Sequence, residues 1–95
     1  MKHPETFNQA CYEVAREIAD IVIERQRKYG HDNINAFGER GILVRVYDKH
    51  ARLRNMIENN IEDADEPRRD SWMDNGGYSI LAIMLDRDWF RLELE

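Results

Sequence analysis

The stretch YSILAIML, residues Tyr78–Leu85, is apolar in nearly every direction around a helical axis. A helix of this kind must be covered on all sides, and three helices from one chain of 95 residues offer too little surface to cover it. The segment Ser71–Asp74 has the spacing of a capping box, so the helix is predicted to begin there and to end near Leu92. The pattern predicts a long apolar C-terminal helix that lies in a subunit interface.

Two more long helices are predicted before it. From Glu5 to Tyr29 apolar residues recur three and four positions apart, which is the spacing of one buried helical stripe: Phe7, Cys11, Val14, Ile18, Ile21 and Val22. Pro4 suits the first turn of this helix and Gly30 its C-terminal cap. The second helix is predicted from about Glu39 to about Glu58. Residues 59–69 lack this periodicity and are acid-rich, so they are predicted to form a loop.

The predicted fold is therefore all-α, a single domain over residues 1–95. Each protomer has three helices, and the protomers assemble into a helical-bundle oligomer. A formal net charge of -5 excludes general nucleic-acid binding and binding to anionic membranes, because both need a positive field. No apolar run reaches the roughly 20 residues that span a bilayer. The lone Cys11 and an N-terminus without an apolar signal core predict a cytoplasmic protein.

The second predicted helix carries an unusual cluster of cations. In RVYDKHARLRN, residues Arg45–Asn55, four Lys and Arg side chains surround Asp48. At 100° per residue, the apolar side of the helix holds Leu43, Val46, His50, Leu53 and Ile57. Arg45, Asp48 and Arg52 share the other side, with Lys49 at its edge. Such a face can be solvated, with ion pairs worth about 0.5 kcal/mol each, or it can bind an anion.

The third predicted helix carries carboxylates above its apolar stripe. Asp70, Asp74 and Tyr78 follow one another at four-residue steps, so they lie on one line. A half-buried carboxylate needs a cation, a metal or hydrogen-bond donors, and the cations of the second helix are the nearest supply. The alternatives are a capping role for Asp74 and a helix-dipole role for Asp70. Gly76 and Gly77 inside the helix predict close approach of a neighbouring helix or of a flat ligand.

Several short motifs occur in an order that resembles a known family: Lys28-Tyr29-Gly30, Phe37-Gly38 with Gly41, Asp48-Lys49, Arg52-Leu53-Arg54-Asn55, and Asp74 with Tyr78. Over residues 24–85 the chain resembles the nucleotide modification associated domain 1 family of phage proteins. That family is similar to the all-α nucleotide pyrophosphohydrolases called MazG-like. The resemblance implies an oligomeric helical protein that handles phosphorylated nucleotides and acts in the cytoplasm of a phage host.

The resemblance also implies which residues could act in catalysis. MazG-like enzymes hold magnesium on a triphosphate with acids from two helices and release pyrophosphate. Here Asp48, Asp70 and Asp74 would be the metal ligands, with Glu17 activating water. Where those enzymes carry an acid-rich helix, however, this chain carries Arg45, Lys49, Arg52 and Arg54, which attract phosphate directly.

The leading hypothesis is therefore a protein that binds a phosphorylated nucleotide, or a nucleotide-derived signal, between subunits and sequesters it against host defence. Phosphates would be held by Arg45, Lys49 and Arg52, and a base would stack on Tyr47, Trp72 or Tyr78. No cofactor is expected for binding. The alternative is a magnesium-dependent nucleoside triphosphate pyrophosphohydrolase. A second alternative is a module that docks its apolar third helix on a host protein.

Overall fold

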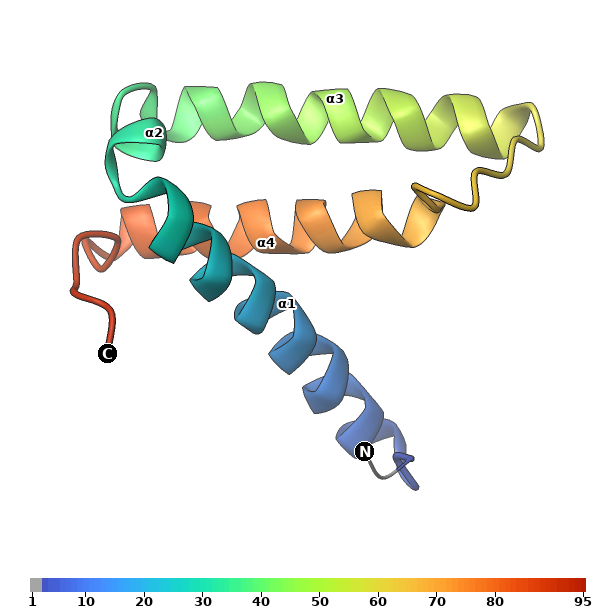
Figure 1. Cartoon of the computed structure of the whole chain (residues 1–95), viewed down its shortest axis with the longest axis horizontal. Helices are drawn as coiled ribbons and strands as arrows, with labels where there is room; N and C mark the ends of the chain where they lie inside the picture. The colour runs from blue at the N-terminus through green and yellow to red at the C-terminus, as the bar shows by residue number, and fades with distance from the viewer. Residues whose placement is uncertain (1–2) are drawn as a thin grey trace.

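The computed structural model describes residues 3–95, and it consists of helices and connecting segments. The helices are α1 (Phe7–Tyr29), α2 (Asp32–Asn35), α3 (Gly38–Glu58) and α4 (Arg68–Asp86). Figure 1 shows α3 and α4 side by side and antiparallel, while α1 crosses α4 obliquely and extends beyond the pair. The all-α prediction is confirmed, and α2 is a single extra turn in the predicted loop. No helix within residues 3–95 has the length and hydropathy needed to cross a bilayer.

The ends of α1 follow from local hydrogen bonds. Thr6 caps the N-terminus, and its side chain accepts a hydrogen bond from the backbone N–H of Gln9 at 3.1 Å. Pro4 lies before this cap, so its predicted place in the first turn is wrong. Gly30 ends the helix at φ 69°, and its N–H donates to the Gln26 carbonyl at 2.9 Å. Because glycine adopts this left-handed conformation without steric cost, the predicted C-terminal cap is confirmed.

The predicted apolar stripe of α1 is covered only in its C-terminal half. Ile18, Ile21 and Val22 are half-buried, and the first and last of them lie against α4. Phe7 and Val14, by contrast, are 85% and 52% exposed, and Cys11 is also exposed. The reason is visible in Figure 1, where the N-terminal half of α1 projects away from the other helices. An apolar stripe is therefore left open in one chain.

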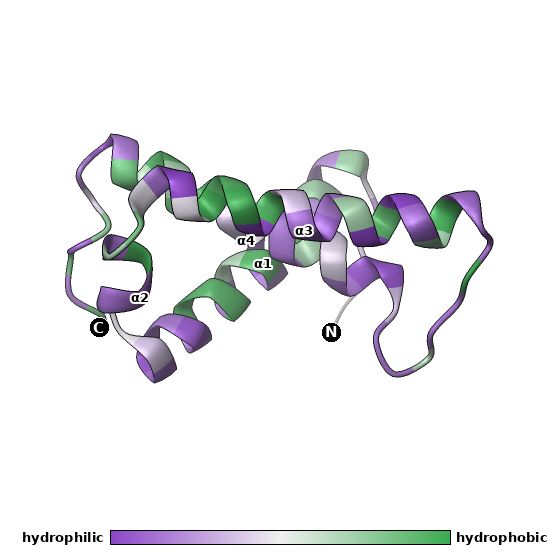
Figure 2. Cartoon of the chain, turned by 90° about the horizontal axis from the view of Figure 1, so that it is seen from above, coloured by the Kyte–Doolittle hydropathy of each residue, from purple (hydrophilic) through white to green (hydrophobic). Residues whose placement is uncertain are grey.

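The face that α3 buries differs from the predicted one. Its buried residues are Ile42, Leu53 and Met56, whereas Leu43 is 67% exposed and His50 is exposed. Between the buried residues lie half-buried Val46 and Lys49, so the buried stripe has the heptad spacing of an antiparallel helix pair. The prediction of cleanly separated apolar and cationic faces is wrong, because cations lie within and beside this stripe. Hydrophilic and hydrophobic residues alternate along α3 in Figure 2.

The start of α4 also differs from the predicted one. The helix begins at Arg68, directly after Pro67, rather than at the predicted capping box. Ser71 is therefore inside the helix, where it is 1% exposed and accepts a hydrogen bond from Arg52. Asp74 pairs with side chains of other helices instead of capping its own. The capping-box interpretation is wrong for both residues, because Pro67 already provides the start of the helix.

The end of α4 builds the hydrophobic core. The helix stops at Asp86, before the predicted Leu92, because Asp88 adopts a left-handed φ of 58°. The Trp89 N–H then donates to the Met84 carbonyl at 2.8 Å, which is the hydrogen bond of a Schellman motif. This turn brings Phe90 back to a buried cluster with Ile34 of α2 and Ile42 of α3. Half-buried apolar residues of α4 surround the cluster.

Candidate functional site

A cavity of about 410 Å³ lies where α1, the segment after it, α3 and α4 meet. Its charged lining residues are Arg25 from α1, Arg45 and Lys49 from α3, and Asp74 from α4. The remaining wall is mixed, with polar, aliphatic and aromatic groups that include Gln26, Tyr29, Asn33, Val22, Leu81 and Tyr78. We call this cavity the basic pocket. Three cations and one carboxylate give it two net positive charges, although the whole chain is acidic.

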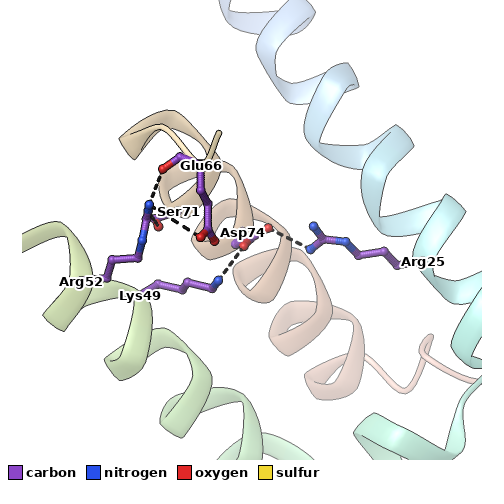
Figure 3. A network of polar contacts seen from close by, with 6 residues as sticks. All are labelled: Arg25, Lys49, Arg52, Glu66, Ser71 and Asp74. Atoms are coloured by element: carbon purple, nitrogen blue, oxygen red, sulfur yellow. Dashed lines mark hydrogen bonds and ion pairs between the residues drawn. The ribbon is translucent and has the colours of Figure 1, made fainter. Parts of the chain in front are cut away.

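Asp74 joins the three long helices at the wall of the basic pocket. Its Oδ1 lies 2.8 Å from Nη1 of Arg25 in α1, and its Oδ2 lies 3.0 Å from Nζ of Lys49 in α3. Figure 3 shows the two cations reaching the carboxylate from opposite sides. The Asp74 side chain is only 13% exposed, so its charge depends on these partners. The predicted pairing of an α4 carboxylate with α3 cations is therefore present in the structure.

The pKa of Asp74 reflects two opposing effects. Burial by itself raises the pKa of the carboxyl group, because burial disfavours the charged form. The hydrogen bonds from Lys49 and Arg25, together with their positive charges, outweigh burial and lower the pKa below its usual value of 3.8. Asp74 is therefore a carboxylate near neutral pH, and it holds both cations in place.

Arg45 supplies a positive charge that is not paired with Asp74, unlike the charges of Arg25 and Lys49. It is half-buried in the pocket wall, and its Nη2 donates to Oδ1 of Asn33 at 2.9 Å. Since the Asn33 amide is neutral, this hydrogen bond orients the guanidinium without neutralising it. A planar guanidinium in such a position retains donors for a bidentate contact with a phosphate group.

The two glycines of α4 explain how α1 comes close enough to form the basic pocket. A methyl group built on Gly76 would lie 2.8 Å from Cδ1 of Ile18, and one on Gly77 would lie 3.1 Å from Cγ2 of Val22. These separations are shorter than ordinary van der Waals contact between carbon atoms. The predicted close approach is therefore confirmed, and the approaching element is a helix.

Arg52 lies outside the basic pocket, although the sequence placed it with Arg45 and Lys49. Its Nη1 donates to Oγ of Ser71 at 2.7 Å, and its Nη2 donates to the Glu66 carbonyl. The Glu66 carboxylate is a further 3.9 Å ion-pair partner (Figure 3). Arg52 thus fastens the acidic loop and the start of α4 to α3. These contacts are structural, and they engage both terminal nitrogens of the Arg52 guanidinium.

Of the aromatic residues predicted to stack on a base, one lines the basic pocket and two lie outside it. Tyr78 lines the basic pocket, whereas Tyr47 and Trp72 are 67% and 58% exposed and lie outside its lining. Sequence reasoning missed several lining residues, among them Arg25 and Tyr29 of α1. A signal for both exists, because Arg25 follows the stripe residue Val22 by three positions and Tyr29 follows it by seven.

The acids proposed for catalysis do not gather in one chain. Asp48 is exposed on α3, Glu17 is exposed on α1, and Asp70 lies outside the basic pocket one turn before Asp74. Both oxygens of Asp74 are already paired with cations. Across residues 3–95 no three His, Cys, Asp or Glu side chains come together as a metal site. The residues present do not fit the magnesium site that the resemblance implies.

Comparisons with protein-family models, with curated proteins and with solved structures give no match to this chain.

Proposed function

We propose that the protein binds a phosphorylated nucleotide, or a nucleotide-derived signal, in the basic pocket and sequesters it. The observation that supports this most is the position of Arg45, which is half-buried beside the cavity and held by a neutral amide. With Arg25 and Lys49 it concentrates positive charge in a chain of net charge -5. A cavity with an excess of one sign of charge attracts ligands of the opposite sign, and guanidinium groups suit phosphate oxygens.

The rest of the wall suits a nucleoside. Tyr78 and Tyr29 contribute aromatic side chains to the lining, and Val22 and Leu81 add apolar surface. Stacking of a base on an aromatic side chain contributes about 1 to 3 kcal/mol. Gln26 and Asn33 supply amide groups that can pair with base or sugar. The lining thus combines phosphate-binding and base-binding groups in one cavity.

Binding without hydrolysis is the version of this function that the side chains favour. The candidate acids Asp48, Asp70 and Glu17 lie away from the basic pocket, and Asp74 is engaged by Arg25 and Lys49. The resemblance to phage proteins suggests the biological use, which is removal of a host signalling nucleotide. The magnesium-dependent hydrolase and the host-protein module remain the alternatives, and neither gains a comparable arrangement of residues.

The test is calorimetry with mono-, di-, tri- and cyclic nucleotides. We expect heat of binding from at least one of them, and Arg45→Ala should weaken it about tenfold or more, because hydrogen bonds to charged groups contribute roughly 1.5 to 3 kcal/mol. The matched control is Arg54→Ala, since Arg54 is also on α3 but is exposed and pairs with Glu58 at 3.1 Å. Absence of heat from every nucleotide at millimolar protein would end the proposal, as would equal losses in both variants.

We also propose that the chain assembles into a helical-bundle oligomer. One support is the open stripe of Phe7, Cys11 and Val14 on α1. A second is an apolar groove of about 280 Å³ between α1 and α4, whose rim includes the exposed side chain of Ile23. A second copy would cover both surfaces, because large contiguous apolar surfaces are rarely left exposed in soluble proteins.

Val14→Glu should shift the assembly toward monomers, since it introduces a charge into the open stripe. Native mass spectrometry or light scattering after gel filtration measures the change. The control is Arg16→Glu, which alters charge on the opposite side of α1 at another exposed position. A wild-type chain that is monomeric at micromolar concentration contradicts the assembly proposal.

A further inference from the structure

The charge of the basic pocket is matched to a small anion. Arg25, Arg45 and Lys49 bring three positive charges, and Asp74 cancels one of them. A phosphate monoester carries about -1.5 to -2 charges near pH 7. One terminal phosphate group therefore neutralises the basic pocket, whereas a di- or triphosphate brings more negative charge than the pocket can balance.

The geometry of Asp74 leaves donors available to such a group. Its two oxygens take one N–H group from Arg25 and one from Lys49. An ammonium group has three donors and a guanidinium has five, so both cations keep donors for a ligand. The carboxylate thus orients Arg25 and Lys49 beside the cavity while it removes part of their charge.

The size and surroundings of the cavity act in the same direction. Its volume of about 410 Å³ is near the lower end of the roughly 300 to 1,000 Å³ range of ligand pockets. Additional phosphoryl groups would have to share the cavity with the Asp74 carboxylate or extend over the surface of an acidic chain. Like charges brought together in this way disfavour binding.

We infer that the basic pocket selects nucleotides with a single phosphate group, the nucleoside monophosphate class, and that Asp74 is the residue that sets this selectivity. The inference rests on the proposed function and makes it more specific. Asp74 acts here by rejecting the more highly charged nucleotides, in addition to positioning Arg25 and Lys49. Selectivity of this kind depends on a repulsive group as well as on attractive ones.

The experiment compares mono-, di- and triphosphates of adenosine, guanosine, cytidine and uridine by calorimetry near pH 7. A chelator is present, because a metal ion would neutralise the additional phosphates. For the base that binds best, the wild type should bind the monophosphate about tenfold or more tightly than the triphosphate. In Asp74→Asn this ratio should move toward the triphosphate by about tenfold, because the basic pocket gains one net positive charge.

Two further variants make the result specific. Asp70→Asn removes the same charge from α4 outside the basic pocket, and it should leave the ratio unchanged. The double variant Arg25→Gln/Asp74→Asn removes one charge of each sign. It should bind every nucleotide more weakly, but its ratio should stay nearer to that of the wild type than the ratio of Asp74→Asn does. Should Asp74→Asn fail to fold by circular dichroism, the wild-type ratio and the double variant decide the question. A double variant that loses the preference for the monophosphate overturns the role of Asp74.

The outcomes separate this inference from the proposed function. Tighter binding of a triphosphate by the wild type overturns the selectivity for one phosphate group and leaves nucleotide binding established. An Asp74→Asn variant that folds and keeps the wild-type ratio overturns the role of Asp74 alone. Absence of binding by every nucleotide in this panel removes the inference, and absence of binding by cyclic nucleotides as well removes both proposals.

Discussion

Gly76→Leu is expected to detach α1 from α4 and to abolish the proposed nucleotide binding. Even a methyl group at this position would lie 2.8 Å from Cδ1 and 3.4 Å from Cγ2 of Ile18, so the larger side chain has no room while α1 is docked. Overpacking of this kind costs about 1 to 3 kcal/mol, and sometimes more. Loss of α1 also removes Arg25, Tyr29 and one wall of the basic pocket. Urea unfolding followed by circular dichroism measures the stability, and calorimetry measures the binding.

Gly76→Ala is the matched control for this prediction. Its methyl group would press mainly on Cδ1 of Ile18, the end of a side chain that can change rotamer. Alanine also favours the helix by about 1 kcal/mol relative to glycine, which offsets the closer contact. We therefore expect stability near that of the wild type. A leucine variant as stable as the alanine variant, with nucleotide binding intact, would show that α1 is not held against α4 at Gly76.

Asp74→Asn is expected to lower the free energy of unfolding by about 2 kcal/mol near pH 7. The substitution keeps the shape of the side chain but leaves Arg25 and Lys49 without a negative partner. A fully buried pair would lose more, but the side chains of Arg25 and Lys49 are 50% and 26% exposed, so water compensates part of the loss. Denaturant unfolding of both proteins at several pH values measures the difference.

The pH dependence of this difference tests its electrostatic origin. Because folding lowers the pKa of Asp74, its carboxylate stabilises the folded chain above the usual value of 3.8. That contribution is lost as the pH falls through the lower pKa of the folded state. The wild type and Asp74→Asn should therefore converge in strong acid. A gap between wild type and Asp74→Asn that is constant with pH would refute the ion-pair explanation.

The sequence predicted the helices well where spacing and caps agree. The bounds of α3 and the end of α1 at Gly30 follow from periodicity and from a glycine suited to a left-handed cap. The ends of α4 were harder to predict from the sequence. Its start at Arg68 depends on Pro67, which competes with the Ser71 capping pattern, and its end depends on Asp88, a non-glycine residue with left-handed φ. Aspartate adopts this conformation only occasionally, so the sequence gives a weak signal.

The sequence predicted only those site residues that helical spacing brings together. Arg45, Lys49, Asp74 and Tyr78 do meet at one cavity, since helical spacing places them on facing surfaces of α3 and α4. Arg52 belongs to the same cationic face, but buried Ser71 and the Glu66 carbonyl bind it elsewhere. Helical spacing places Arg25 near the line of Val22, but its partner Asp74 could not be assigned without knowing that α1 crosses α4 at its glycines. Side-chain partners across helices depend on this crossing, which periodicity alone does not specify.

The oblique crossing of α1 has a consequence for the motions of the molecule. This helix packs mainly on α4, at the glycine pair and through the Arg25–Asp74 bridge, while α3 and α4 share a longer seam. The partial opening that breaks the fewest contacts is therefore a rotation of α1 about the connection at Gly30. This rotation would open the cavity to a ligand. A bound ligand that contacts both α1 and the opposite wall of the cavity would resist this rotation. Slow dissociation of the ligand and protection of the α1 amides from hydrogen exchange would therefore occur together.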